Sequence, residues 1–401
     1  MTVALQHVPL LDLQSQYAAI RAEIHAAVDA VLASQRFILG PNVEACETEV
    51  ARFCRAAHAV GVASGSDALL LALMASGIGQ GDEVITTPYT FFATAAAAVR
   101  LGATPVFVDI DPLTLNLDVA QVAARVTPRT KAIIPVHLFG QCAEMAPLLA
   151  LARQHRLTVI EDAAQVIGAE YLLATDPGLG EDSAVAWCHA GTMGQLGCLS
   201  FYPSKALGAY GDAGMVLTND AGLAERVRAL RTHGGVKKYQ HDMLGDNSRL
   251  DELQAAVLRV KLRHLAAWIA ARQANAGRYD RLFQQAGLAD ASGVLDGGKP
   301  VALPVVAPGR THIFYVDAIR ARHRDRLRAY LADHGVGTDV YYPIPVHLQP
   351  CFAALGYRAG DFPKAEQAAR QSLALPMFPE LHDSQQTYVV EQIANFYRQQ
   401  G

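Results

Sequence analysis

Residues 198–214 read Cys-Leu-Ser-Phe-Tyr-Pro-Ser-Lys-Ala-Leu-Gly-Ala-Tyr-Gly-Asp-Ala-Gly, and the rest of the chain is organised around the lysine in this stretch, Lys205. Three glycines follow it, at positions 208, 211 and 214, and they allow tight turns and a close approach of the backbone to a ligand. In weakly polar surroundings a lysine amine can lose its proton and attack a carbonyl. The same pattern also fits a surface lysine in a glycine-rich turn, so the role of Lys205 has to be inferred together with other residues of the chain.

The composition excludes several classes of protein. The chain has 401 residues, of which 51% are hydrophobic and 18% charged, which predicts a globular protein of two or three domains. A net charge of −4 without a long basic run argues against a nucleic-acid-binding protein. The six cysteines show neither a Cys-x-x-Cys pair nor zinc-finger spacing, so we expect no structural metal, no disulfide framework and a cytoplasmic location. We expect neither a secretory signal nor a membrane span.

The chain up to residue 260 alternates short apolar runs with amphipathic stretches, which predicts repeated strand–helix units in a large α/β domain. The apolar runs are continuous rather than alternating, as is typical of parallel strands that are covered on both faces. Ligands of such sheets bind at the carboxyl ends of the strands. The predicted strands are 58–63, 83–87, 104–108, 131–136, 157–160, 199–202 and 215–218, and the predicted helices are 10–34, 44–55, 68–76, 91–100, 117–124, 143–155 and 221–233.

A long helix is predicted to join this domain to a smaller one. Leu250, Leu253, Val257 and Val260 are spaced as on one helix face, and the pattern continues to about Phe283. We expect residues 1–260 to form the large domain and residues 261–401 a small α+β domain. Before the long helix, residues 234–245 read as a polar loop. After it, the sequence predicts strands at 313–319 and 337–342 and helices at 325–334, 363–372 and 384–398.

Polar groups gather where the predicted strands end. Ser64-Gly65-Ser66-Asp67 lies between a strand and a helix, where it forms either an anion site or an ordinary helix cap by Ser66. Pyridoxal phosphate (PLP) needs an amine for its aldehyde, a carboxylate for its ring nitrogen and a pocket for its phosphate. Lys205, the strand-end Asp162 and Gly65-Ser66 would supply these groups, and Phe91 could stack on the ring. The alternative is that these residues do not form one site: Gly65-Ser66 would belong to a helix cap, and Asp162 and Lys205 would be ordinary surface residues.

Long motifs along nearly the whole chain decide between these alternatives. They are Phe-Ile-Leu-Gly-Pro (37–41), Ser-Gly-Ser-Asp-Ala-Leu (64–69), Gly-Asp-Glu-Val-Ile (81–85), Pro-Val-Phe-Val-Asp-Ile (105–110), Pro-Val-His-Leu-Phe-Gly (135–140), Glu-Asp-Ala-Ala-Gln (161–165), Ser-Phe-Tyr-Pro-Ser-Lys (200–205), Asn-Ser-Arg-Leu-Asp-Glu-Leu-Gln-Ala-Ala (247–256) and Tyr-Tyr-Pro-Ile-Pro-Val-His (341–347). With these motifs the sequence resembles the fold-type I PLP aminotransferases of the DegT/DnrJ/StrS group, which act on nucleotide-linked keto sugars.

The resemblance implies a role for each motif residue. Lys205 is implied to be the catalytic Schiff-base lysine and Asp162 the partner of the pyridinium nitrogen. The implied cofactor-binding residues also include Gln165 at the ring hydroxyl, Phe91 over the ring, and Gly65, Ser66 and Ser200 at the phosphate. Asn247 is implied to reach the phosphate from a neighbouring subunit, which predicts a homodimer with shared active sites. Relatives handle the sugar nucleotide at the positions of Lys237, Tyr239, Tyr342 and His347.

The implied activity is the transfer of an amino group from an amino acid, L-glutamate, to a dTDP- or UDP-linked 3-keto sugar. The alternatives are a 4-keto substrate, dehydration of the sugar, and a PLP-binding regulator without turnover. Lys205 argues against dehydration, because dehydrating relatives carry histidine there. Two features depart from the group's pattern: Asp212-Ala213-Gly214 replaces an acidic-Gly-Gly sequence, and the segment 172–191 is longer than the usual linker and is expected to reshape the sugar pocket.

Overall fold

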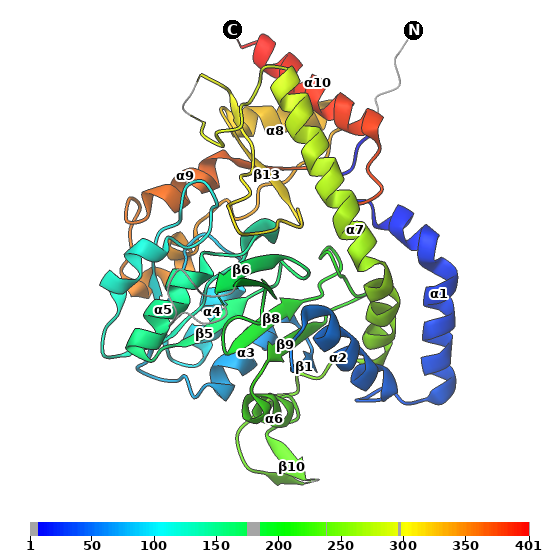
Figure 1. The fold of residues 1–401 in the computed structure, drawn as a ribbon, viewed down its shortest axis with the longest axis vertical. Helices are drawn as coiled ribbons and strands as arrows, with labels where there is room; N and C mark the ends of the chain where they lie inside the picture. The colour runs from blue at the N-terminus through cyan, green and yellow to red at the C-terminus, as the bar shows by residue number, and fades with distance from the viewer. Residues whose placement is uncertain (1–6, 175–184, 238, 296–297, 401) are drawn as a thin grey trace.

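The structure, a computed structural model, describes residues 7–174, 185–237, 239–295 and 298–400. Its centre is a seven-stranded sheet in the order β1-β9-β8-β5-β4-β2-β3 (Figure 1). Strand β9 runs opposite to the other six strands, which all point the same way, so the predicted large, mostly parallel sheet is confirmed. The strands are β1 (His58–Val62), β2 (Glu83–Thr86), β3 (Thr104–Phe107), β4 (Thr130–Ile133), β5 (Thr158–Asp162), β8 (Leu196–Ser200) and β9 (Gly214–Thr218).

The sheet is buried on both faces, which explains the continuous apolar runs in the sequence. In β9, Met215 and Leu217 pack into one hydrophobic core, whereas Val216 between them packs into another on the opposite face. Side chains that alternate along a strand thus all meet apolar partners. The helices that cover the two faces are α2 (Pro41–Cys54), α3 (Gly65–Ala75), α4 (Ala93–Arg100), α5 (Met145–His155) and α6 (Ala221–Leu230).

The C-terminal part has a hydrophobic core of its own. Helix α7 (Glu252–Gln285) crosses the molecule in Figure 1, from α1 (Leu13–Ser34) and α2 at one end to α10 (Asp383–Arg398) at the other. Phe283 near its end packs with Ile319 and with Val8 from the start of the chain. The remaining elements are the antiparallel strands β12 (Val301–Ala302), β13 (Asp317–Ala321) and β14 (Ser372–Leu375), and the helices α8 (Arg324–Asp333) and α9 (Pro363–Gln371).

Two predicted elements are wrong. The segment 117–124 forms two short 3₁₀ turns, Val119–Gln121 and Ala123–Arg125, instead of a helix. The side chain of Asp118 caps the first turn, so the helical backbone starts at Val119, and Pro128 restricts the backbone of the residue before it. The segment 337–342 contains no strand, because only Asp339 forms a bridge to a neighbouring segment.

The structure contains two short β-hairpins in segments for which the sequence predicted no strands. Within the predicted polar loop 234–245, β10 (Gly235–Lys237) pairs with β11 (Gln240–His241). In the long segment 172–191, β6 (Glu170–Ala174) pairs with β7 (Val185–His189), and residues 175–184 of that segment lie outside the described residues. Within the described ranges, no helix combines the length and the apolar character that crossing a bilayer requires.

We expect Glu252→Ala to lower the free energy of unfolding by about 2 kcal/mol. Glu252 is buried at the start of α7, and its carboxylate accepts hydrogen bonds from the backbone N–H groups of Asn42 and Val43, the first turn of α2. The Gly40 cap residue of α2 has no side chain to replace it. Urea unfolding measures the change, with the exposed Glu391→Ala on α10 as control. Equal stability of the two variants would contradict the capping role.

Candidate active site

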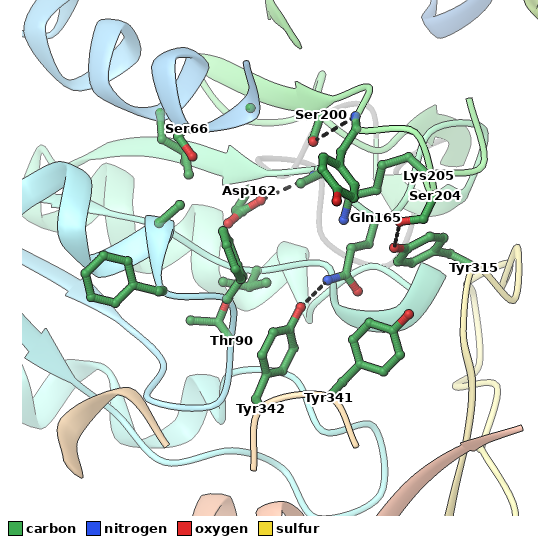
Figure 2. A pocket seen from close by; sticks show the side chains of 18 of the residues that line it. Ser66, Thr90, Asp162, Gln165, Ser200, Ser204, Lys205, Tyr315, Tyr341 and Tyr342 are labelled. Atoms are coloured by element: carbon green, nitrogen blue, oxygen red, sulfur yellow. Dashed lines mark hydrogen bonds between the residues drawn. The ribbon is translucent and has the colours of Figure 1, made fainter. Parts of the chain in front are cut away.

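A cavity of about 690 Å³ opens at the carboxyl ends of β5 and β8, between the start of α3 and the segment 339–349 (Figure 2). Strands β1, β5 and β8 point in the same direction, so the chain leaves all three at this edge of the sheet. The cavity brings together eight of the residues singled out from the sequence: Gly65, Ser66, Phe91, Asp162, Gln165, Ser200, Lys205 and Tyr342.

Asp162 places a buried carboxylate on the floor of this cavity. Its side chain is only 5% exposed, and it accepts hydrogen bonds from the Thr94 hydroxyl at 2.7 Å and the Ala164 N–H at 3.2 Å. Burial raises the pKa of Asp162, and the hydrogen bond from Thr94 opposes that rise more than any other contact does. A cation in the cavity would therefore gain strongly from facing this carboxylate.

Lys205 faces the same cavity with its amine against an aromatic ring. The Nζ atom lies 4.6 Å from the centroid of Tyr315, and within the described residues Lys205 forms no ion pair. Its backbone N–H donates to the carbonyl of Tyr202, which closes a tight turn. The amine is thus held at the cavity wall without a carboxylate to neutralise it, which suits a nucleophile.

The start of α3 forms an anion-binding cradle with Ser200. A Cβ atom on Gly65 would lie 2.6 Å from the Cβ of Ser200, so only glycine lets the helix start come this close to β8. The helix is capped by Ser64, whose hydroxyl accepts from the N–H of Asp67, so the alternative of a cap by Ser66 is wrong. Ser66 is therefore left to line the cavity, where the N–H groups of a helix start favour a phosphate.

The glycines after Lys205 act through close packing and not through left-handed turns, since none of the three is among the residues with positive φ. A Cβ atom on Gly208 would lie 2.3 Å from the carbonyl oxygen of Pro203. One on Gly214 would lie 2.3 Å from the carbonyl oxygen of Ser64. These contacts press the loop of Lys205 and the start of α3 against each other.

A family model of the DegT/DnrJ/EryC1/StrS aminotransferase family matches residues 18–394. The chain belongs to this family. It is 51% identical, over 98% of its length and 99% of the relative's, to a pleiotropic regulatory protein of Geobacillus stearothermophilus. It is 45% identical to a UDP-N-acetyl-3-dehydro-alpha-D-glucosamine 3-aminotransferase of Acidithiobacillus ferrooxidans, over 94% and 95% of the two chains. S. venezuelae DesV, solved in complex with a ketimine intermediate, superposes with a TM-score of 0.88 at 42% identity, covering 97% and 98% of the chains.

Three observations of the structure indicate that PLP, the cofactor of this aminotransferase family, fits the cavity. The buried Asp162 carboxylate faces the cavity with hydrogen bonds from only Thr94 and Ala164, and a protonated ring nitrogen would give it a cationic partner there. Gly65 leaves room at the helix start for a phosphate beside Ser200. Lys205 presents an amine that no described acidic group pairs with. Amine, carboxylate and anion cradle are the three groups that the cofactor requires.

Gln165 and Tyr342 of this aminotransferase both line the cavity and are hydrogen-bonded to each other. The amide nitrogen Nε2 of Gln165 donates to the Tyr342 hydroxyl at 2.6 Å, and Oε1 accepts from the N–H of Phe139 at 2.8 Å (Figure 2). Tyr342 has a left-handed backbone with φ of 59°. Burial raises its pKa, so the hydroxyl stays neutral and can both donate and accept. Phe91, 58% exposed, stands near it with the ring centroids 6.5 Å apart.

Four predicted site residues do not line the cavity of their own chain. Asn247 is exposed, and Lys237 and Tyr239 lie on the β10–β11 hairpin, which projects from the molecule beyond α6 (Figure 1). His347 is buried, with Nε2 at 3.3 Å from Glu366 and its ring against Phe362. In this chain His347 thus packs the segment 339–349 against Glu366 and Phe362 and is not among the residues that line the cavity.

Sequence reasoning missed several residues of the aminotransferase site. Thr94 positions Asp162, and Tyr315 and Tyr341 form the wall beside Lys205 (Figure 2). His137 also lines the cavity, and its Nε2 lies 2.8 Å from Oε2 of the buried Glu161, the residue before Asp162. Thr94 follows the predicted stacking residue Phe91 by less than one helical turn, which was the one available signal. Tyr315 comes from a distant part of the chain that no local pattern connects with Lys205.

We expect Asp162→Asn to stabilise the cofactor-free protein at neutral pH by about 1 kcal/mol or more. A carboxyl whose pKa is raised by folding costs stability once the pH exceeds its ordinary pKa of 3.8, and the cost grows until the pH passes the raised value. The gain should therefore increase as the pH rises above this ordinary value, as urea unfolding at a series of pH values would show. Asp29→Asn, at an exposed position of α1, is the control. A variant less stable than the wild type at about pH 8 would refute the unpaired state of Asp162.

Proposed function

We propose that the protein transfers the amino group of L-glutamate to a 3-keto sugar carried on dTDP or UDP. The observation that carries the proposal is the convergence of Lys205, Asp162 and the start of α3 on one cavity. Membership of the aminotransferase family supports the reaction type. The 3-position and the UDP carrier are supported by the name of the Acidithiobacillus ferrooxidans relative. A donor amine is supported by the ketimine described for S. venezuelae DesV.

Each cavity residue has a separate task in this reaction. When bound, PLP supplies a protonated ring that accepts electrons from a carbon losing its proton. Asp162 would hold the ring nitrogen and keep it protonated, Gln165 would bind the ring hydroxyl, and Phe91 would cover the ring. Gly65, Ser66 and Ser200 would bind the phosphate. Lys205 would hold the cofactor's carbonyl carbon, and its freed amine Nζ would take the proton from the α-carbon of the donor as a general base.

The proposal includes a homodimer with shared sites. Asn247, Lys237 and Tyr239 are exposed and do not line the cavity of their own chain, and we infer that they contact the cavity of a second copy. Asn247 would complete the phosphate cradle, and Lys237 and Tyr239 would contact the sugar nucleotide together with Tyr342. His347 would support this surface from below, since Glu366 holds its ring. We place the enzyme in the cytoplasm.

A regulator without turnover is the second candidate, because the relative of Geobacillus stearothermophilus is named a regulatory protein. Membership of the aminotransferase family and the aminotransferase of Acidithiobacillus ferrooxidans favour an enzyme over a regulator. The half-reaction with the amino donor distinguishes the two functions, because a regulator binds the cofactor but does not convert it.

The wild type loaded with PLP is expected to absorb at about 410–430 nm, and L-glutamate should shift this absorbance to about 330 nm. Lys205→Ala should show neither the first band nor the shift, because no amine then holds the cofactor. The exposed Lys299→Ala is the control. A wild-type spectrum without the first band would overturn the assignment of the cofactor, and a first band that glutamate leaves unchanged would favour the regulator.

With glutamate and purified substrates, we expect the amino sugar to form from a 3-keto nucleotide sugar and not from its 4-keto isomer. Mass spectrometry of the product identifies the position and separates amine incorporation from loss of water. Formation of product from the 4-keto isomer alone would show that the proposed position is wrong. Loss of water without incorporation of nitrogen would make the protein a dehydratase.

A further inference from the structure

Three polar side chains on one face of α7 reach into the segments that surround Lys205. Gln254, Lys261 and Arg272 are separated by 7 and 11 residues along the helix. With about 100° of rotation per residue, they lie within about 20° of one another around the helix axis. Each of the three donates to backbone carbonyls outside the helix. This face of α7 therefore holds other parts of the backbone.

Lys261 is the central member of the three and has unusual surroundings for a lysine. It is only 1% exposed, and its Nζ donates to the carbonyl of Gly208 at 2.7 Å and lies 4.4 Å from the ring centroid of Tyr210. None of the described acidic residues pairs with it. Burial lowers its pKa to about 8. Burying an amine costs free energy that a methionine would not, so packing alone does not account for this residue.

The carbonyl that Lys261 binds belongs to the base of the Lys205 loop. This loop leaves β8 at Phe201 and is closed where the N–H of Ala209 donates to the carbonyl of Phe201 at 2.8 Å. At the closure Gly208 packs against Pro203 so tightly that no Cβ atom would fit. A shift of the Gly208 peptide therefore has to move the turn that carries Lys205, because the loop has no slack to absorb it.

The other two side chains hold the neighbouring segments. Gln254 binds both backbone groups of Tyr210, since its Oε1 accepts from the N–H at 2.8 Å and its Nε2 donates to the carbonyl at 3.3 Å. Arg272 is 3% exposed and donates to the carbonyls of Phe314, Tyr315 and Met377. The ring of Tyr315 is the surface on which the Lys205 amine lies. One helix thus holds the loop below the amine and the residue beside it.

We propose that Lys261 is a positioning residue for the transamination, which fixes the loop at Gly208 so that the Lys205 amine points into the cavity. Its ammonium or amine group contacts neither substrate nor cofactor and acts only through the backbone of the loop. Gln254 supports the same loop at Tyr210. The inference rests on the proposed function, because it assigns Lys261 a task only if Lys205 holds the cofactor.

The test compares Lys261→Met and Gln254→Leu with the wild type and with Lys299→Met. Lys299 is a matched control, because it also donates to a glycine carbonyl, that of Gly287 at 3.0 Å, but at an exposed site. The first readout is the rate at which added PLP becomes linked to Lys205, fixed by borohydride and counted by mass spectrometry of the Lys205 peptide. The second is kcat and KM for glutamate and for the sugar. Thermal unfolding shows whether each variant folds.

For Lys261→Met we expect linkage to Lys205 and kcat to fall by about tenfold or more, with both KM values within about twofold. Gln254→Leu should lower the linkage and kcat by a smaller factor, and Lys299→Met should leave both unchanged. If Lys261→Met does not fold, the linkage rate, kcat and KM values of Gln254→Leu test the inference instead. A folded variant that links PLP at the wild-type rate would overturn the inference, as would a rise in KM without loss of kcat. No linkage in the wild type would instead overturn the proposed function.

Discussion

The parallel pairing of β5 with β8 is the constraint on which the site depends. It sets Asp162 opposite Cys198, immediately before the chain leaves β8 toward Lys205. Because both strands point the same way, the carboxylate and the loop of the amine emerge at one edge of the sheet. Strand β1 lies two places from β8 in the sheet and points the same way. The start of α3, which follows β1 in the chain, therefore lies at the same edge. A shift of register between β5 and β8 would separate the two functional groups.

Around this pairing the protein buries groups that cost stability when the cavity holds no ligand. Asp162 has two hydrogen bonds and no cationic partner within bonding distance, and its pKa is raised accordingly. The neighbouring Glu161 shows the contrast: its carboxylate accepts from His137 and from the N–H groups of Gly191, Met193 and Gly194. The Glu161 carboxylate thus has four hydrogen-bond partners within the protein, whereas the Asp162 carboxylate has two and faces the cavity.

Much of the fold followed from the sequence, because buried parallel strands and amphipathic helices leave local patterns. The segments 58–63 and 143–155 correspond to β1 and α5 within two residues at each end. One error is the segment Val119–Arg125, which forms two 3₁₀ turns, and the other falls where strand pairing needs a distant partner, as with Asp339 and Ala374. The motif residues predicted for the cofactor do converge on one cavity, but Thr94 and Tyr315 were missed because they act through contacts made only on folding.

The sequence by itself determined the family, the mostly parallel sheet and the residue types of the site, because these depend on local patterns and on motifs that stand in order along the chain. Only the tertiary structure decided which groups are unpaired, which helix end is free for an anion and which side chains hold the Lys205 loop. Lys261 and Gly208, 53 residues apart, show why. Burial, hydrogen-bond partners and the pKa of a buried carboxyl depend on what surrounds a side chain in space, and that is set by packing between distant segments.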